Sequence, residues 1–208
     1  MNRITTYIRQ SLQDIYPPEE VKALSMLICC DMLGLDALDI YMGKDIILSE
    51  CKQRELENII FRLQKNEPIQ YIRGVAEFCG RNFKVASGVL IPRPETAELV
   101  ELIVEESPNA RRLLDIGTGS GCIAISLDKK LPDAEVEAWD ISEEALAIAR
   151  KNNDALEAGV RFLQRDVLSD DWEKVPSFDV IVSNPPYVTE TEKNEMDANV
   201  LDWEPGLA

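Results

Sequence analysis

The sequence feature that most constrains the fold is a glycine-rich segment between two apolar runs, LLDIGTGSGCIAI at residues 113–125. The run at 112–116 predicts a strand, and residues 121–130 predict a helix. Gly117, Gly119 and Gly121 between them form a G-x-G-x-G turn. Glycines let the backbone turn tightly and approach a ligand, and the N-terminus of the following helix offers unpaired amides. We therefore expect a ligand site where this strand meets this helix.

The same alternation of strand and helix continues along the chain. Strands are predicted at 135–139, 160–164 and 178–182, and a helix at 142–156 that begins at Ser142 as N-cap. Strands that alternate with helices indicate a doubly wound parallel sheet, so the fold class is α/β.

A different pattern precedes this region. Residues 3–66 have helical periodicity, as in the spacing of Leu56, Ile59, Ile60 and Leu63 behind the candidate N-cap Ser49. Residues 68–92 are rich in glycine, aromatic and β-branched residues, which predicts a hairpin. A further helix is predicted at about 95–106. We expect three parts: a small helical domain at 1–67, a β-hairpin linker at 68–92, and an α/β domain at 93–208.

Composition excludes several kinds of chemistry. The chain has no histidine, so Ser-His and Cys-His nucleophiles, H-E-x-x-H metal sites and a histidine base are all excluded. Its five cysteines show no C-x-x-C spacing, so neither a disulfide framework nor a zinc site is predicted. No apolar run approaches the ~18 residues of a membrane span, and the N-terminus does not resemble a secretory signal. We expect a cytoplasmic protein without a membrane partner.

Charge is distributed unevenly. Residues 1–86 hold 11 Lys and Arg against 12 Asp and Glu, whereas residues 87–208 hold 11 against 26, a balance of −15. An acidic surface repels phosphate backbones, so we expect no stable nucleic-acid complex. A solvated acidic surface that maintains solubility also explains the charge.

Three aspartates accompany the glycine turn. Asp140 ends the strand after the loop, 23 residues beyond Gly117, where a carboxylate can accept hydrogen bonds from ribose hydroxyls. Asp115, just before the loop, would repel a pyrophosphate but suits a ligand with an ammonium group and no phosphate, such as S-adenosylmethionine. Asp166 could accept from an adenine amino group, although taken alone it fits a turn residue equally well.

The segment SNPPY at 183–187 follows the fourth strand of the predicted sheet and should lie at the same edge. The Asn184 side-chain oxygen and the Pro185 carbonyl could accept both hydrogens of a planar NH2 group, while Pro186 adds rigidity and Tyr187 supplies a ring. Such a clamp could direct the poorly nucleophilic nitrogen of an amide or aromatic amine at a sulfonium methyl. A turn after an edge strand is the structural alternative.

These motifs resemble one family. LLDIGTGSG, WDIS, RDVL and SNPPYV, preceded by LIPRPET and EPIQYIRGVAEFCG, are similar to the protein-(glutamine-N5) methyltransferases that modify peptide chain release factors. The resemblance runs through nearly the whole chain. It implies a helical N-terminal domain, a hairpin linker and a class I, Rossmann-like methyltransferase sheet, with the glutamine of a Gly-Gly-Gln loop as substrate. By position it implies that Gly117 to Gly121, with Thr118 and Ser120 between the glycines, Asp140 and Asp166-Val167 hold S-adenosylmethionine. It also implies that Asn184 to Tyr187 hold the glutamine amide, with Asn184 in contact with the cofactor as well.

Other observations leave alternatives open. Arg93, Glu95 and Thr96 in IPRPET fit either a pocket wall or an ordinary helix start, and Cys79 stands where an aromatic residue is expected. Only 21 residues follow Tyr187, where the family continues with further strands, so we expect a C-terminally truncated sheet and weak or absent activity. NPPY is shared with methyltransferases that act on exocyclic amines of nucleic acids, such as adenine N6. That reaction and a non-catalytic binding module are the alternative functions.

Overall fold

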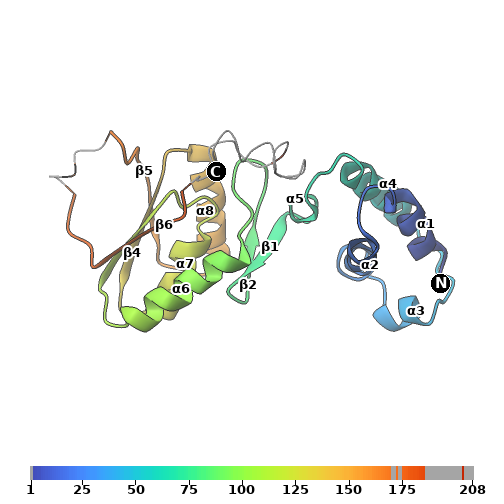
Figure 1. The fold of residues 1–208 in the computed structure, drawn as a ribbon, viewed down its shortest axis with the longest axis horizontal. Coiled ribbons are helices and arrows are strands. Elements are labelled where there is room, and N and C mark those ends of the chain that lie inside the picture. Colours follow the sequence, from blue (N-terminus) through green and yellow to red (C-terminus); the bar gives the residue numbers. More distant parts are fainter. Residues whose placement is uncertain (1, 170–171, 173–174, 186–202, 204–208) are drawn as a thin grey trace. The chain divides into compact units, whose positions relative to one another are not determined.

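The computed structural model describes residues 2–169, 172, 175–185 and 203, and the chain divides into two compact units, Met1–Arg73 and Gly74–Ala208 (Figure 1). Each unit has a hydrophobic core of its own. Among the described residues, no helix combines the length and the apolar character that crossing a membrane would require.

The first unit is helical, as predicted. Its elements are α1 (Arg3–Leu12), α2 (Pro18–Met26), the π-helix η1 (Leu27–Met32), α3 (Ala37–Tyr41), α4 (Glu50–Leu63) and α5 (Ile69–Arg73). Their apolar stripes pack together around Ile8, Leu12 and Ile28, which are fully buried. Ser49 caps α4 as predicted, because its side chain accepts the N–H of Lys52.

Residues 69–73 differ from the prediction. They form the short helix α5 instead of part of a hairpin, because the Pro68 carbonyl accepts the N–H groups of Tyr71 and Ile72 at 3.0 and 3.2 Å. A proline at the start of a helix loses no hydrogen bond, since the first amides have no helical partner anyway. Tyr71 is buried and anchors the turn.

The predicted hairpin follows α5 and belongs to the second unit. Strands β1 (Val75–Phe78) and β2 (Arg81–Lys84) pair antiparallel. The turn between them consists of Cys79 and Gly80, both with positive φ (47° and 70°). Cys79 thus occupies a backbone conformation that glycine or asparagine would adopt more readily.

A parallel sheet forms the centre of the second unit. In the described part of the chain its order is β5-β4-β3-β6, and all pairs are parallel. The strands are β3 (Arg112–Ile116), β4 (Glu135–Asp140), β5 (Arg161–Gln164) and β6 (Val180–Ser183). These bounds lie within two residues of the predicted ones. Because β4 and β6 both pair with β3, their carboxyl ends meet at one edge on either side of the glycine loop.

Helices complete the second unit, and Figure 1 shows them gathered beside the sheet. They are α6 (Pro94–Glu106), α7 (Cys122–Lys130) and α8 (Glu143–Ala155). The crossovers β3-α7-β4 and β4-α8-β5 move in the same direction along the sheet, which places α7 and α8 on the same face. Ser142 caps α8 as predicted, accepting the N–H of Ala145 at 3.2 Å.

Candidate active site

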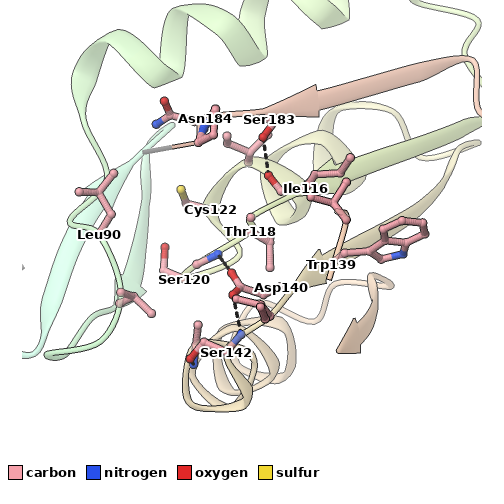
Figure 2. Close-up of a pocket in the computed structure, with 18 of the residues that line it drawn as sticks. Leu90, Ile116, Thr118, Ser120, Cys122, Trp139, Asp140, Ser142, Ser183 and Asn184 are labelled. Carbon is pink, nitrogen blue, oxygen red and sulfur yellow. Dashed lines mark hydrogen bonds between the residues drawn. The ribbon is translucent and has the colours of Figure 1, made fainter. Parts of the chain in front are cut away.

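A cavity of about 600 Å³ lies at the carboxyl edge of the sheet in the second unit (Figure 2). A volume of this order suits a nucleoside-sized ligand together with part of a second molecule. The wall is formed by the glycine loop, the ends of β4 and β6, the start of α8, and the segment that leads into α6. The residues that line it are Gly88, Val89, Leu90, Pro92, Arg93, Thr96, Ile116, Gly117, Thr118, Gly119, Ser120, Cys122, Ile123, Trp139, Asp140, Ile141, Ser142, Glu144, Ala145, Arg165, Asp166, Val167, Leu168, Ser183, Asn184 and Pro185.

The three glycines of the loop all have positive φ, but they serve two purposes. At Gly117 (φ +72°) and Gly119 (φ +55°) an added Cβ would meet nothing within 4 Å, so the backbone there is open to a ligand. At Gly121 (φ +82°) a Cβ would lie 3.1 Å from the side chains of Ala149 and Ile125. Gly117 and Gly119 are therefore places for close approach, whereas Gly121 lets α7 pack closely on α8.

Hydrogen bonds to neighbouring elements hold the loop in place. The Trp139 carbonyl accepts the N–H groups of Gly117 and Thr118 at 2.8 and 3.0 Å. The Asp140 carboxylate accepts the N–H of Gly119 through Oδ2 and that of Ser142 through Oδ1, both at 2.9 Å (Figure 2). Each carboxylate oxygen can accept a further hydrogen bond, so Asp140 can hold the loop and still accept hydrogen bonds from ribose hydroxyls. The contact with the ribose stays a prediction.

The prediction that Asp115 contacts the ligand is wrong, because Asp115 does not line the cavity. It is completely buried beneath the loop and is absent from the cavity wall, because β3 is an inner strand covered on both faces. The Thr118 hydroxyl donates to Asp115 Oδ2 at 2.6 Å, whereas Oδ1 has no hydrogen-bond partner in the described part of the chain. Burial raises the pKa of this carboxyl to about 6, partly offset by the bond from Thr118. Asp115 thus supports the floor of the site and does not form its surface.

Asp166 and Val167 do line the cavity, as predicted. Asp166 Oδ1 also accepts the N–H of Leu168 at 3.0 Å, so the turn interpretation of this residue is confirmed, whereas its role as an acceptor for an adenine amino group stays a prediction. Next to them, the Arg165 guanidinium lies 4.5 Å from the centre of the buried Trp139 ring. Because Trp139 is 1% exposed and its ring also contacts the ring of Trp172, this ring closes that side of the cavity and offers no free aromatic face to a ligand.

The far side of the cavity is formed by the end of β6, where Figure 2 shows Ser183 and Asn184 opposite the glycine loop. The Ser183 hydroxyl donates to the Ile116 carbonyl at 2.8 Å and ties β6 to β3. Asn184 and Pro185 both line the cavity, so the structure brings together these two residues and the loop as predicted. Pro186 and Tyr187, the other members of the predicted clamp, lie outside the described residues.

Two parts of the site were not predicted from the sequence. Gly88, Val89, Leu90 and Pro92 form one wall, although nothing in their local pattern indicates a ligand. The other is Asn152 on α8, which is buried and lies directly behind the loop: its Nδ2 donates to the carbonyls of Ser120 (2.8 Å) and Lys84 (3.0 Å), and its Oδ1 accepts the Lys84 N–H (2.7 Å). The sequence signal for Asn152 is that a polar residue lies on the apolar face of the helix predicted at 142–156.

Two family models match the chain. The model of the methyltransferase small domain matches residues 93–201, and that of the PrmC N-terminal domain matches residues 4–74. The structure of Pyrococcus abyssi tRNA (uracil-54, C5)-methyltransferase in complex with S-adenosyl-L-homocysteine aligns with a TM-score of 0.45 and 19% identity, covering 58% of this chain and 30% of that one.

Curated relatives match the chain over its whole length. A release factor glutamine methyltransferase of Bacteroides thetaiotaomicron is 84% identical over 208 residues, which are all of this chain and 75% of the relative. The protein of the same name from Flavobacterium psychrophilum is 42% identical over 98% of this chain and 73% of its own length. The chain belongs to the family of release factor glutamine methyltransferases.

Proposed function

We propose that this chain transfers a methyl group from S-adenosylmethionine to the side-chain amide nitrogen of a glutamine in peptide chain release factors, in their Gly-Gly-Gln loop. The names of the two relatives above state that they methylate glutamine in release factors. One observation carries the proposal: Asn184 and Pro185 line the same cavity as the glycine loop, so a donor and an acceptor amide can meet there.

The residues of the loop side fit the donor. Gly117 and Gly119 have room for a ligand against their backbone, and Asp140 and Asp166 offer acceptors at the ends of neighbouring strands. The acidic side chains in the wall favour a ligand that carries positive charge and no phosphate. When bound, S-adenosylmethionine supplies an electrophilic methyl group on a positively charged sulfur.

The residues at the end of β6 fit the acceptor. The Asn184 Oδ1 and the Pro185 carbonyl each accept one hydrogen of a carboxamide NH2, and proline offers no N–H that would compete. An amide nitrogen is a weak nucleophile because its lone pair is delocalised, so the rate depends on how well these acceptors hold it in line with the methyl group. As the N–C bond forms, the C–S bond breaks with its electron pair on sulfur, and the nitrogen releases one proton to solvent.

The net charge argues against a nucleic acid as the acceptor. Residues 87–208 carry the balance of −15 described above, and only Arg93 and Arg165 contribute a guanidinium or ammonium group to the described cavity wall. A phosphate backbone would be repelled by this surface.

A labelling experiment tests the proposal. The chain is incubated with methyl-labelled S-adenosylmethionine and a release factor, with a release factor whose Gly-Gly-Gln glutamine is changed to alanine, and with ribosomal RNA or DNA. We expect label in the first protein alone. Label in nucleic acid, or in the alanine variant to the same extent, would contradict the assignment.

An Asn184→Ala variant tests the role of the clamp. Methyl transfer should fall by at least about 100-fold, since the acceptor nitrogen loses one of two positioning bonds. Affinity for S-adenosylmethionine, measured by calorimetry, should change less than about threefold. Retained transfer would remove Asn184 from its proposed role.

A further inference from the structure

The Asn184 side chain is held by a residue from a distant part of the second unit. The Asn184 Nδ2 donates to the hydroxyl of Thr96 at 3.3 Å. Within the described part of the chain, this hydrogen bond holds the Asn184 side chain. The two residues are 88 positions apart in the sequence, and both line the cavity. The contact therefore links the start of α6 to the end of β6.

Thr96 is itself fixed in position. It is the third residue of α6, which begins at Pro94, and its N–H donates to the Arg93 carbonyl at 3.1 Å. Thr96, Val100 and Ile103 share the buried face of the helix at helical spacing. The β-branched side chain also has restricted χ1 freedom, so its hydroxyl is presented to Asn184 from a rigid support.

The direction of this hydrogen bond matters for chemistry. A carboxamide has an acceptor edge and a donor edge, so a bond from Nδ2 to Thr96 turns Oδ1 away from Thr96. The reverse rotamer would present the Asn184 NH2 to the NH2 of the acceptor amide, and two donors cannot bind one another. An Asn184 side chain that rotates freely would spend part of its time in that unproductive orientation.

We propose that Thr96 is a positioning residue for methyl transfer: its hydroxyl fixes the plane of the Asn184 carboxamide and thereby aims Oδ1 at the acceptor nitrogen. This rests on the proposed function and assigns a role to a residue whose sequence context, the start of a helix, left its purpose open. Thr96 acts through Asn184 and makes no bond to the reacting atoms.

Kinetics of two variants test the role. Thr96→Val has nearly the same shape and lacks the hydroxyl, whereas Thr96→Ser keeps the hydroxyl and lacks the methyl group. For Thr96→Val we expect kcat for release-factor methylation to fall about tenfold, the effect of one hydrogen bond, with KM for the release factor and affinity for S-adenosylmethionine within about twofold of the parent. Thr96→Ser should retain at least about half of the parental kcat. An unchanged kcat in Thr96→Val, or an equal loss in Thr96→Ser, would overturn the proposal.

A spectroscopic measurement separates this proposal from the proposed function. In the 15N-labelled chain, the side-chain NH2 signals of Asn184 are identified by their absence in Asn184→Ala. We expect these signals to shift and to exchange faster with solvent in Thr96→Val, and to stay close to their parental positions in Thr96→Ser. Unchanged signals in Thr96→Val would overturn the contact even if methyl transfer were normal. Conversely, shifted signals in a chain that does not methylate release factors would contradict the proposed function and leave the contact intact.

A double variant addresses whether Thr96 acts through Asn184. In the Asn184→Ala background, Thr96→Val should cause no further loss of single-turnover transfer, because the group that it positions is gone. A full additional tenfold loss would show that Thr96 acts independently and would overturn the proposal. Should Thr96→Val fail to fold, as judged by circular dichroism, Thr96→Ala is used in all three measurements with the same expectations.

Discussion

Replacement of Asn152 by alanine should destabilise the second unit and loosen the glycine loop. Asn152 is 1% exposed and makes three hydrogen bonds that connect α8 to the Ser120 carbonyl in the loop and to both backbone groups of Lys84 at the end of β2. Alanine removes all three bonds and leaves two carbonyl groups and one N–H without this partner.

The size of the effect follows from the surroundings of each bond. The bond to Ser120 is buried, so its loss should contribute about 1–3 kcal/mol as an unsatisfied acceptor. Lys84 is exposed, and water can replace the side chain at its two backbone groups, so these bonds should contribute about 0.5 kcal/mol each. We expect the free energy of unfolding of this unit to fall by about 2–4 kcal/mol.

The assay is urea unfolding followed by tryptophan fluorescence. All three tryptophans, at 139, 172 and 203, lie in the second unit, so the signal reports that unit alone. Asn153→Ala is the matched control: the same change at the neighbouring residue of α8 removes one bond, from the Val160 N–H at 3.1 Å. It should lower the free energy of unfolding by about 1 kcal/mol. Equal losses in the two variants would refute the assignment of Asn152 as a link between hairpin and loop.

Three further predictions concern the same unit. Gly121→Ala should abolish binding of S-adenosylmethionine in calorimetry and lower the unfolding temperature, because the new Cβ would lie 3.1 Å from the side chains of Ala149 and Ile125 and the residue has a φ of +82°. Gly119→Ala should lower the unfolding temperature less, because the space around its Cβ is open. The raised pKa of Asp115, about 6 against 3.8 in the unfolded chain, means that the folded state binds its proton more tightly, so this residue contributes stability below pH 4 that is lost as pH rises through 6. Urea titrations at pH 4 and pH 7 should show most of that contribution, about 2 kcal/mol, in the parent and not in Asp115→Asn, and equal pH dependence in both would contradict it. Brief treatment with a maleimide at pH 7 should modify the exposed Cys51 and spare the buried Cys122, because burial raises the pKa of the Cys122 thiol to about 12. If mass mapping found both cysteines modified at the same rate, the burial of Cys122 would be contradicted.

Local patterns predicted most of the secondary structure. The strand at 112–116 and the helix caps at Ser49 and Ser142 were predicted correctly, because apolar periodicity and capping chemistry act over a few neighbouring residues. Residues 69–73 were assigned to a hairpin because their aromatic and β-branched side chains favour strands, whereas the carbonyl of the preceding proline and the burial of Tyr71 stabilise a helical turn.

Contacts between distant residues were less predictable. The sequence placed Asn184 and the glycine loop at one sheet edge, since the α/β topology determines where parallel strands end. It could not show that Asp115 lies beneath the loop, because that depends on which strand is central and on how closely Thr118 folds over it. The contacts of Asn152 with Ser120 and of Asn184 with Thr96 join residues 32 and 88 positions apart, and no local pattern encodes such pairs.

The two backbone bonds of Asp140 have a consequence for how substitutions at this position are interpreted. Since this carboxylate accepts the N–H groups of Gly119 and Ser142, its removal should loosen the glycine loop whether or not the donor is bound. An analogue of the donor without its ribose 2′- and 3′-hydroxyls separates the two contributions, because it can make no hydrogen bond to Asp140 through the sugar. The affinity that this analogue still loses in Asp140→Ala measures the contribution of Asp140 to the structure of the loop. We expect that contribution to be substantial, so that Asp140 stabilises the glycine loop as much as it binds the ribose.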